Sequence, residues 1–69
     1  MGTIEIVVIS DKYIITRKSA EGDIYWNALQ NAWKVNRREA TRFFTREEAN
    51  AKEGEYLRNM GETITIVPV

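Results

Sequence analysis

The chain has 69 residues, and ten lysines and arginines balance ten aspartates and glutamates, so its formal net charge is zero. A chain this short builds one hydrophobic core, and 43% hydrophobic residues with one proline are typical of a folded protein, so residues 1–69 are predicted to form a single domain. Neither cysteine nor histidine occurs, which excludes disulfides, zinc sites with thiolate or imidazole ligands, and nucleophilic catalysis that depends on either residue.

The first part of the chain is predicted to be β-structure. Residues 3–9 are rich in β-branched side chains and predict a strand, and residues 13–18 predict a second strand in a hairpin with it. Residues 19–23 indicate a loop in which Gly22 adopts a positive φ angle. A third strand is predicted over residues 24–29. Its alternation places Ile24, Trp26 and Ala28 on one face and Tyr25, Asn27 and Leu29 on the other.

The middle of the chain is less regular. Extended structure is predicted to resume at residues 33–35. Residues 36–42 fit a short helical turn and an irregular strand equally well.

A helix start is the sharpest local signal in the sequence. Thr45 and Glu48 have the spacing of a capping box, in which the hydroxyl accepts from the Glu48 N–H and the carboxylate reaches back to Thr45. Phe44 precedes the cap and is expected to pack on Ala49 as a hydrophobic staple.

The helix is predicted over residues 46–59, with Gly61 as its C-terminal cap. Gly54 weakens it by about 1 kcal/mol, so the helix depends on packing against the sheet. Residues 62–67 predict a last strand, and Pro68 falls where a ladder ends or lies at an edge. The apolar side of the helix is expected to comprise Ala49, Tyr56, Leu57 and Met60.

This order predicts an α+β fold, a mostly antiparallel sheet of three to four strands with one helix on one face, in the order β-β-β-α-β. One helix leaves the second face open, although residues 3–9 are apolar on both faces and Tyr25 and Leu29 add to the second one. We therefore expect a homo-oligomer that covers this face. The alternative is that the linker with Trp33 folds over it.

Charge is balanced overall but not locally. Residues 33–46 have a net charge of +4, between a stretch of −1 before them and −3 after them. Guanidinium groups match carboxylates and phosphates, and aromatic rings stack on bases or guanidiniums, so this segment is a candidate anion site. The candidate binding residues are Tyr25, Trp33, Lys34, Arg37, Arg38, Arg42 and Arg46. The alternative is that these charges compensate the neighbouring acidic helix or solvate a loop.

The other functional signals are few. Trp26, Phe43 and Phe44 are expected in the core, because a small domain needs large buried side chains, and Trp33 is expected to be exposed. The serines lack a histidine partner and no glycine-rich loop opens a helix, so we expect no enzyme activity, no cofactor and no metal. No apolar run approaches the roughly 18 residues of a membrane span, and the N-terminal residues do not have the pattern of a secretory signal. The absence of cysteine fits a reducing cytoplasm, so we expect a cytoplasmic protein that does not contact membranes.

Three stretches of the chain form a familiar pattern, namely KYIITRKSAEGDIYW, AWKVNRREATRFFTREEANA and the closing TITIVPV. Together they resemble a loosely defined group of small bacteriophage-encoded accessory proteins. The matching positions are Tyr13, Trp33, Ala40, Phe43, Thr45, Glu47, Glu48 and Ala49. The resemblance implies a small non-enzymatic binder in the host cytoplasm that inhibits a host protein, including defence proteins. On the residues alone, the partner is a protein with an acidic surface or a small anionic ligand such as a nucleotide.

Two alternatives remain. The sheet followed by F-x-T-x-E-E-A is also similar to plant ethylene-response-type DNA-binding domains, and related sheets occur in phage integrase arm-binding domains. That similarity implies a DNA-reading sheet face made of Arg17, Lys18, Trp26 and Lys34. The second alternative is a structural protein that only self-associates.

Overall fold

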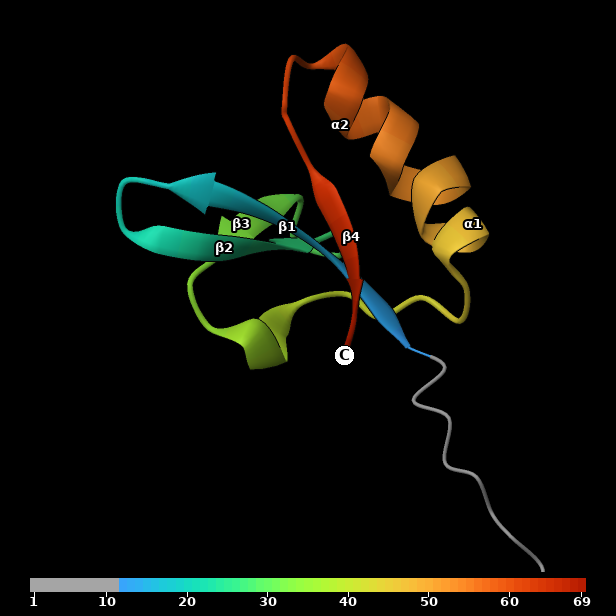
Figure 1. Ribbon diagram of the computed structural model, residues 1–69, viewed down its shortest axis with the longest axis horizontal. Helices are drawn as coiled ribbons and strands as arrows, with labels where there is room; N and C mark the ends of the chain where they lie inside the picture. The colour runs from blue at the N-terminus through green and yellow to red at the C-terminus, as the bar shows by residue number, and fades with distance from the viewer. Residues whose placement is uncertain (1–11) are drawn as a thin grey trace, which may run out of the picture.

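The computed structural model describes residues 12–69, which form a four-stranded antiparallel sheet and one helix (Figure 1). The strands are β1 (Tyr13–Ser19), β2 (Gly22–Asn27), β3 (Ala32–Lys34) and β4 (Thr65–Pro68), in the spatial order β3-β2-β1-β4. The predicted α+β class and the order of strands and helix are confirmed. The strand predicted at residues 3–9 and its hairpin lie outside the described residues.

Strands β1 and β2 form a tight hairpin. Gly22 has a φ angle of 104°, the left-handed region predicted for it, and Ser19 Oγ accepts from the Glu21 N–H at 3.2 Å. The predicted end of β2 at Leu29 is wrong, because the strand stops at Asn27. There the Asn27 Oδ1 atom accepts from the Gln30 N–H at 2.8 Å and starts a turn, and Leu29 on that turn is 95% exposed.

Strand β1 lies at the centre of the sheet. Ile15 is paired with Ile66 of β4, while the Tyr13 N–H donates to the Phe43 carbonyl at 2.7 Å and the Phe43 N–H donates back at 2.9 Å. The first half of β1 therefore has a partner on each side.

The core lies between the helix and one face of the sheet. Its buried members are Ile15, Trp26, Phe43, Ala49, Leu57 and Ile66. Burial of Trp26 and Phe43 is confirmed. The prediction that Phe44 is a core residue is wrong, because it is 64% exposed with the Lys12 ammonium 4.9 Å from its ring centroid. Phe43 faces inward in extended backbone, so its neighbour faces outward, and the predicted staple of Phe44 on Ala49 adds nothing to the core.

The helix runs over residues 46–59, as predicted, but in three parts. They are α1 (Arg46–Ala49), the π-helical turn η2 (Asn50–Gly54) and α2 (Glu55–Asn59). The Thr45 hydroxyl accepts from the Glu48 N–H at 3.0 Å, which confirms the predicted cap. The Glu48 carboxylate reaches one residue further back than predicted, to the Phe44 N–H at 3.4 Å.

The helix ends at the predicted glycine. Gly61 has a φ angle of 90°, its N–H donates to the Arg58 carbonyl, and the Glu62 N–H donates to the Leu57 carbonyl, which is the Schellman pattern. Since Glu62 belongs to this cap, the last strand begins at Thr65 and not at the predicted residue 62, and Pro68 lies in an edge strand.

Only part of the predicted apolar side of the helix is buried. Ala49 and Leu57 are fully buried, but Tyr56 is 44% and Met60 61% exposed, so that prediction is half wrong. Both exposed side chains belong to the last residues of the helix and its C-terminal cap.

A short 3-10 turn, η1 (Arg37–Glu39), lies on the side of the sheet opposite the helix (Figure 1). Of the two structures predicted for residues 36–42, a short helical turn and an irregular strand, the helical turn is therefore present. The Asn27 side-chain amide donates to the Glu39 carbonyl at 2.7 Å, so the linker does fold over part of the second face. Within residues 12–69, no helix has the length and apolarity that a membrane crossing requires.

Candidate anion-binding site

Three of the predicted arginines line one cavity of about 280 Å³ on the η1 side of the sheet. Arg37 and Arg38 come from η1, and Arg42 comes from the extended segment that follows it. The other lining residues are Asn36, Ile14 and Val69. We call this cavity the arginine pocket. Since Ile14 is 1% exposed, the pocket combines an apolar residue with three guanidinium groups.

Local hydrogen bonds hold the segment that carries these arginines. Asn36 caps the turn, with its Oδ1 atom accepting from the Arg38 N–H at 2.9 Å. Beyond the turn, Ala40 is buried and the Thr41 N–H donates to the Trp26 carbonyl at 2.9 Å. The Thr41 hydroxyl in turn accepts from the Ala28 N–H at 2.8 Å. The backbone on which the arginines sit is therefore tied to β2 and the turn after it.

The three guanidinium groups differ in their surroundings. Arg37 Nη2 donates to the Pro68 carbonyl at 3.1 Å, and the guanidinium carbon lies 5.8 Å from the centroid of the Tyr25 ring. Within residues 12–69, neither Arg38 nor Arg42 has a hydrogen-bond or ion-pair partner for its guanidinium. Arg37 is thus held in place, while the other two present free donors.

The arginines of the pocket form no ion pair with the acidic side chains of the helix. The two ion pairs between side chains of residues 12–69 join Arg17 to Glu62 at 3.2 Å and Lys18 to Asp23 at 3.2 Å. Neither pair involves an arginine of the pocket.

Two further predicted residues lie beside the pocket. Tyr25 is under the Arg37 guanidinium, and Lys34 is its direct cross-strand partner between β2 and β3. Paired residues share a face of the sheet, so both lie on the η1 side.

Trp33 lies on the other face. It pairs with Trp26 across β2 and β3, with ring centroids 5.2 Å apart, and the Arg17 guanidinium carbon is 4.9 Å from its ring centroid. It is half-buried against the core, so the prediction of an exposed Trp33 is wrong. Because Trp33 is the cross-strand partner of Trp26, both side chains lie on the face that the helix covers.

Arg46 is also separate from the arginine pocket. Its Nη1 atom donates to the Ile66 carbonyl at 2.8 Å, and its guanidinium carbon lies 5.3 Å from the centroid of the Tyr13 ring. The structure therefore brings together Arg37, Arg38 and Arg42, sets Tyr25 and Lys34 beside them, and puts Trp33 and Arg46 elsewhere.

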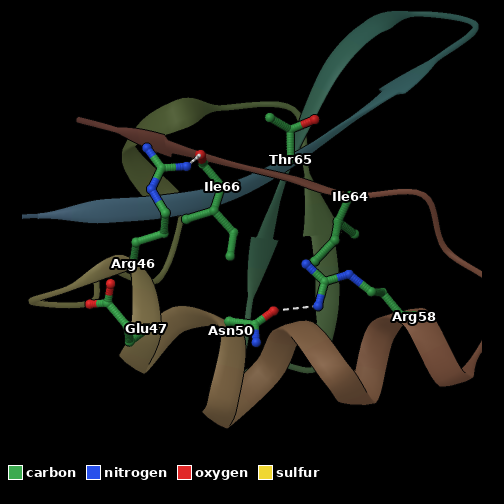
Figure 2. Close-up of a pocket in the computed structure, with 7 residues that line it drawn as sticks. All are labelled: Arg46, Glu47, Asn50, Arg58, Ile64, Thr65 and Ile66. Carbon is green, nitrogen blue, oxygen red and sulfur yellow. Dashed lines mark hydrogen bonds between the residues drawn. The ribbon is translucent and has the colours of Figure 1, made fainter.

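A second cavity, of about 460 Å³, was not predicted. It lies between the helix and β4 (Figure 2), and we call it the helix–strand groove. Its lining residues are Arg46, Glu47, Asn50, Arg58, Ile64, Thr65 and Ile66. The sequence feature that could have pointed to this groove is Gly54, which we considered only as a weak point of the helix. Arg58 donates a hydrogen bond to the Asn50 side chain beside this glycine.

The predicted DNA-reading face does not form. Arg17 and Trp26 lie on the face that the helix covers, and Trp26 is 3% exposed. Lys18 and Lys34 lie on the opposite face, because successive residues of a strand alternate.

Comparisons of the sequence and the structure with known proteins identified no relative. No protein-family model matches the sequence, and no significant match was found among curated proteins or solved structures.

Proposed function

We propose that this protein is a non-enzymatic binding protein that engages an acidic group of a partner protein through the arginine pocket. The observation that supports the proposal most is the convergence of Arg37, Arg38 and Arg42 on one cavity, with two guanidiniums unpaired within residues 12–69. Planar guanidiniums bind carboxylates in pairs of parallel hydrogen bonds, and Arg37 is already oriented by its contacts.

The size of the pocket favours an acidic side chain over a whole small molecule. Cavities that enclose drug-sized ligands measure about 300–1,000 Å³, and this one has about 280 Å³. A nucleotide would insert its phosphate and leave the base outside. The carboxylate of an aspartate or glutamate, or a single phosphate group, is small enough for this volume.

The sequence resemblance to phage accessory proteins suggests the biological setting. In this proposal the partner is a host protein in the cytoplasm, and occupation of its acidic surface inhibits it.

The test is an NMR titration at low ionic strength, where electrostatic binding is strongest. Sodium glutarate represents an acidic side chain, and sodium phosphate represents a phosphate group. We expect glutarate to shift the backbone amides of residues 36–42. The shifts should disappear in the double variant Arg38→Glu, Arg42→Glu and persist in Lys52→Glu, a charge reversal at an exposed position of the helix.

Two results would contradict the proposal. One is the absence of shifts in residues 36–42 with either anion. The other is an equal response in wild type and the double variant. A short DNA duplex that binds where glutarate does not would favour the DNA-binding alternative.

A further inference from the structure

The helix–strand groove runs along the outer edge of β4. Arg46, Asn50 and Arg58 reach it from the helix, and Ile64 and Ile66 reach it from β4 and the residue before it (Figure 2). Its volume of about 460 Å³ lies within the range of ligand-binding cavities. This surface is separate from the arginine pocket.

The backbone of β4 turns hydrogen-bonding groups toward this groove. The Val69 N–H donates to the Lys12 carbonyl of the chain entering β1 at 2.8 Å. Antiparallel pairs alternate between bonded and non-bonded, so the groups of Val67 and Thr65 also face β1, whereas those of Ile66 face outward. The Ile64 carbonyl also faces outward, because it lies opposite the Thr65 N–H in the same trans peptide unit. Arg46 confirms this orientation, because its guanidinium donates to the Ile66 carbonyl from outside the sheet.

The edge accepts only a short partner. Pro68 has no N–H, and its carbonyl already accepts from Arg37. Within residues 12–69, no strand pairs with the outer side of β4. Among the described residues, the outward groups without a hydrogen-bond partner are the N–H of Ile66 and the carbonyl of Ile64.

The helix side of the groove is positively charged, and a glycine leaves space for two of its side chains. Arg46 and Arg58 outnumber Glu47, and each guanidinium has further N–H donors beyond the one hydrogen bond it makes. Arg58 donates to the Asn50 side chain beside Gly54. A Cβ at Gly54 would lie 3.0 Å from that Asn50 oxygen and 3.4 Å from Arg58 Nη1, so the glycine leaves room for this pair.

We propose that the helix–strand groove binds a short extended peptide segment with acidic side chains. The segment adds to β4 through backbone hydrogen bonds with Ile64 and Ile66. Its carboxylates pair with Arg46 and Arg58, which is the charge complementarity that selects an acidic segment. Arg46 keeps its bond to the Ile66 carbonyl and uses its remaining donors for the ligand.

The test is selection of a random heptapeptide library on the immobilised full-length protein. We expect enrichment of aspartate and glutamate at alternate positions, since alternate residues of a strand face the same side. A selected peptide should shift the Ile64 and Ile66 amides in NMR spectra. Arg46→Gln and Arg58→Gln should each weaken its binding about tenfold or more, because each removes charge-assisted hydrogen bonds. Lys52→Gln, at an exposed helix position that lines neither cavity, should leave the affinity unchanged.

A second measurement tests the backbone pairing. The selected peptide is resynthesised with N-methyl groups at alternate residues, in two versions that block opposite edges. One version should bind like the parent and the other about tenfold more weakly.

Several outcomes would overturn the inference. The first is a selection that shows no enrichment of acidic residues, and the second is equal binding of the two methylated peptides. The third is a peptide with the sequence of residues 3–9 that binds more strongly than the selected peptide, which would assign the groove to the chain's own segment. Peptide shifts confined to residues 36–42 would reject the groove and leave the arginine pocket supported. If glutarate does not shift residues 36–42 while the peptide still binds the groove, the arginine pocket is rejected and the groove is supported.

Discussion

Phe43 and Phe44 are adjacent and chemically identical, yet they lie in opposite environments. Phe43 is 5% exposed and joins the core, while Phe44 is 64% exposed. The backbone pairing of Phe43 with Tyr13 sets this difference, because alternate side chains of an extended chain face opposite sides. At the scale of single residues, burial therefore determines what a substitution costs.

Leu57 offers the clearest stability test. It is fully buried between the helix and the sheet, so Leu57→Ala should lower the free energy of unfolding by about 2–5 kcal/mol through lost burial and the cavity left behind. Leu29→Ala, at a position 95% exposed, is the matched control and should change it by less than about 0.5 kcal/mol. Urea denaturation followed by circular dichroism measures both. Equal losses would contradict the burial of Leu57.

The helix cap is a second test at this scale. Thr45→Ala removes the acceptor of the Glu48 N–H and should cost about 1 kcal/mol. Thr63→Ala, at an exposed threonine outside the strands, should cost much less. Thermal and urea unfolding of both variants, compared with wild type, measure the difference. A loss no larger for Thr45→Ala than for Thr63→Ala would show that the cap does not stabilise the helix.

At the scale of elements, the helix is attached to the sheet by more than apolar contacts. The Trp26 indole N–H on β2 donates to the Glu53 carboxylate at 2.7 Å, and Glu53 belongs to the π-helical turn. Tyr56 also contacts Trp26, with ring centroids 6.5 Å apart. The π turn thus lies where the helix meets the largest core side chain.

Removal of this carboxylate should loosen the helix. Glu53→Ala leaves the indole N–H of the buried Trp26 without its partner, which should cost about 1.5–3 kcal/mol. Glu53→Gln keeps an acceptor oxygen and should lose less. Glu55→Ala, at an exposed position two residues on, controls for the helix itself. Hydrogen exchange of the indole N–H reports the bond directly. Exchange that stays unchanged in Glu53→Ala would contradict it.

At the scale of the whole molecule, the basic segment is divided between two surfaces. Arg37, Arg38 and Arg42 lie on the η1 side of the sheet, while Arg46 joins Arg58 on the edge of β4. Both surfaces carry arginines, so the zero net charge, which sums segments of opposite sign, does not describe either of them.

Self-association remains a prediction at this scale. Val35 and Phe44 are 67% and 64% exposed, and residues 3–9 add an apolar stretch. Burial of such side chains between copies stabilises an oligomer, so sedimentation at micromolar concentration should show species heavier than 8.0 kDa. A single 8.0 kDa species would reject the homo-oligomer.

Local interactions made much of the fold predictable. The helix begins at a capping box and ends at a glycine with positive φ, and both depend on residues within a few positions of each other. The convergence of Arg37, Arg38 and Arg42 followed from their nearness along the chain. Arg46 did not join them, because the backbone between Arg42 and Arg46 passes the bridge with Tyr13 before the helix starts.

The sequence by itself determined the α+β class, the helix bounds, the hairpin glycine and the burial of Trp26, because each depends on local geometry or on the size of one side chain. Only the tertiary structure decided the side on which Trp33 lies, the exposure of Phe44 and the existence of the helix–strand groove. These depend on strand register and on contacts between segments distant in sequence, such as Trp26 with Glu53 and Arg46 with Ile66. Hydrophobic pattern and propensity describe each segment separately and do not specify which segments meet.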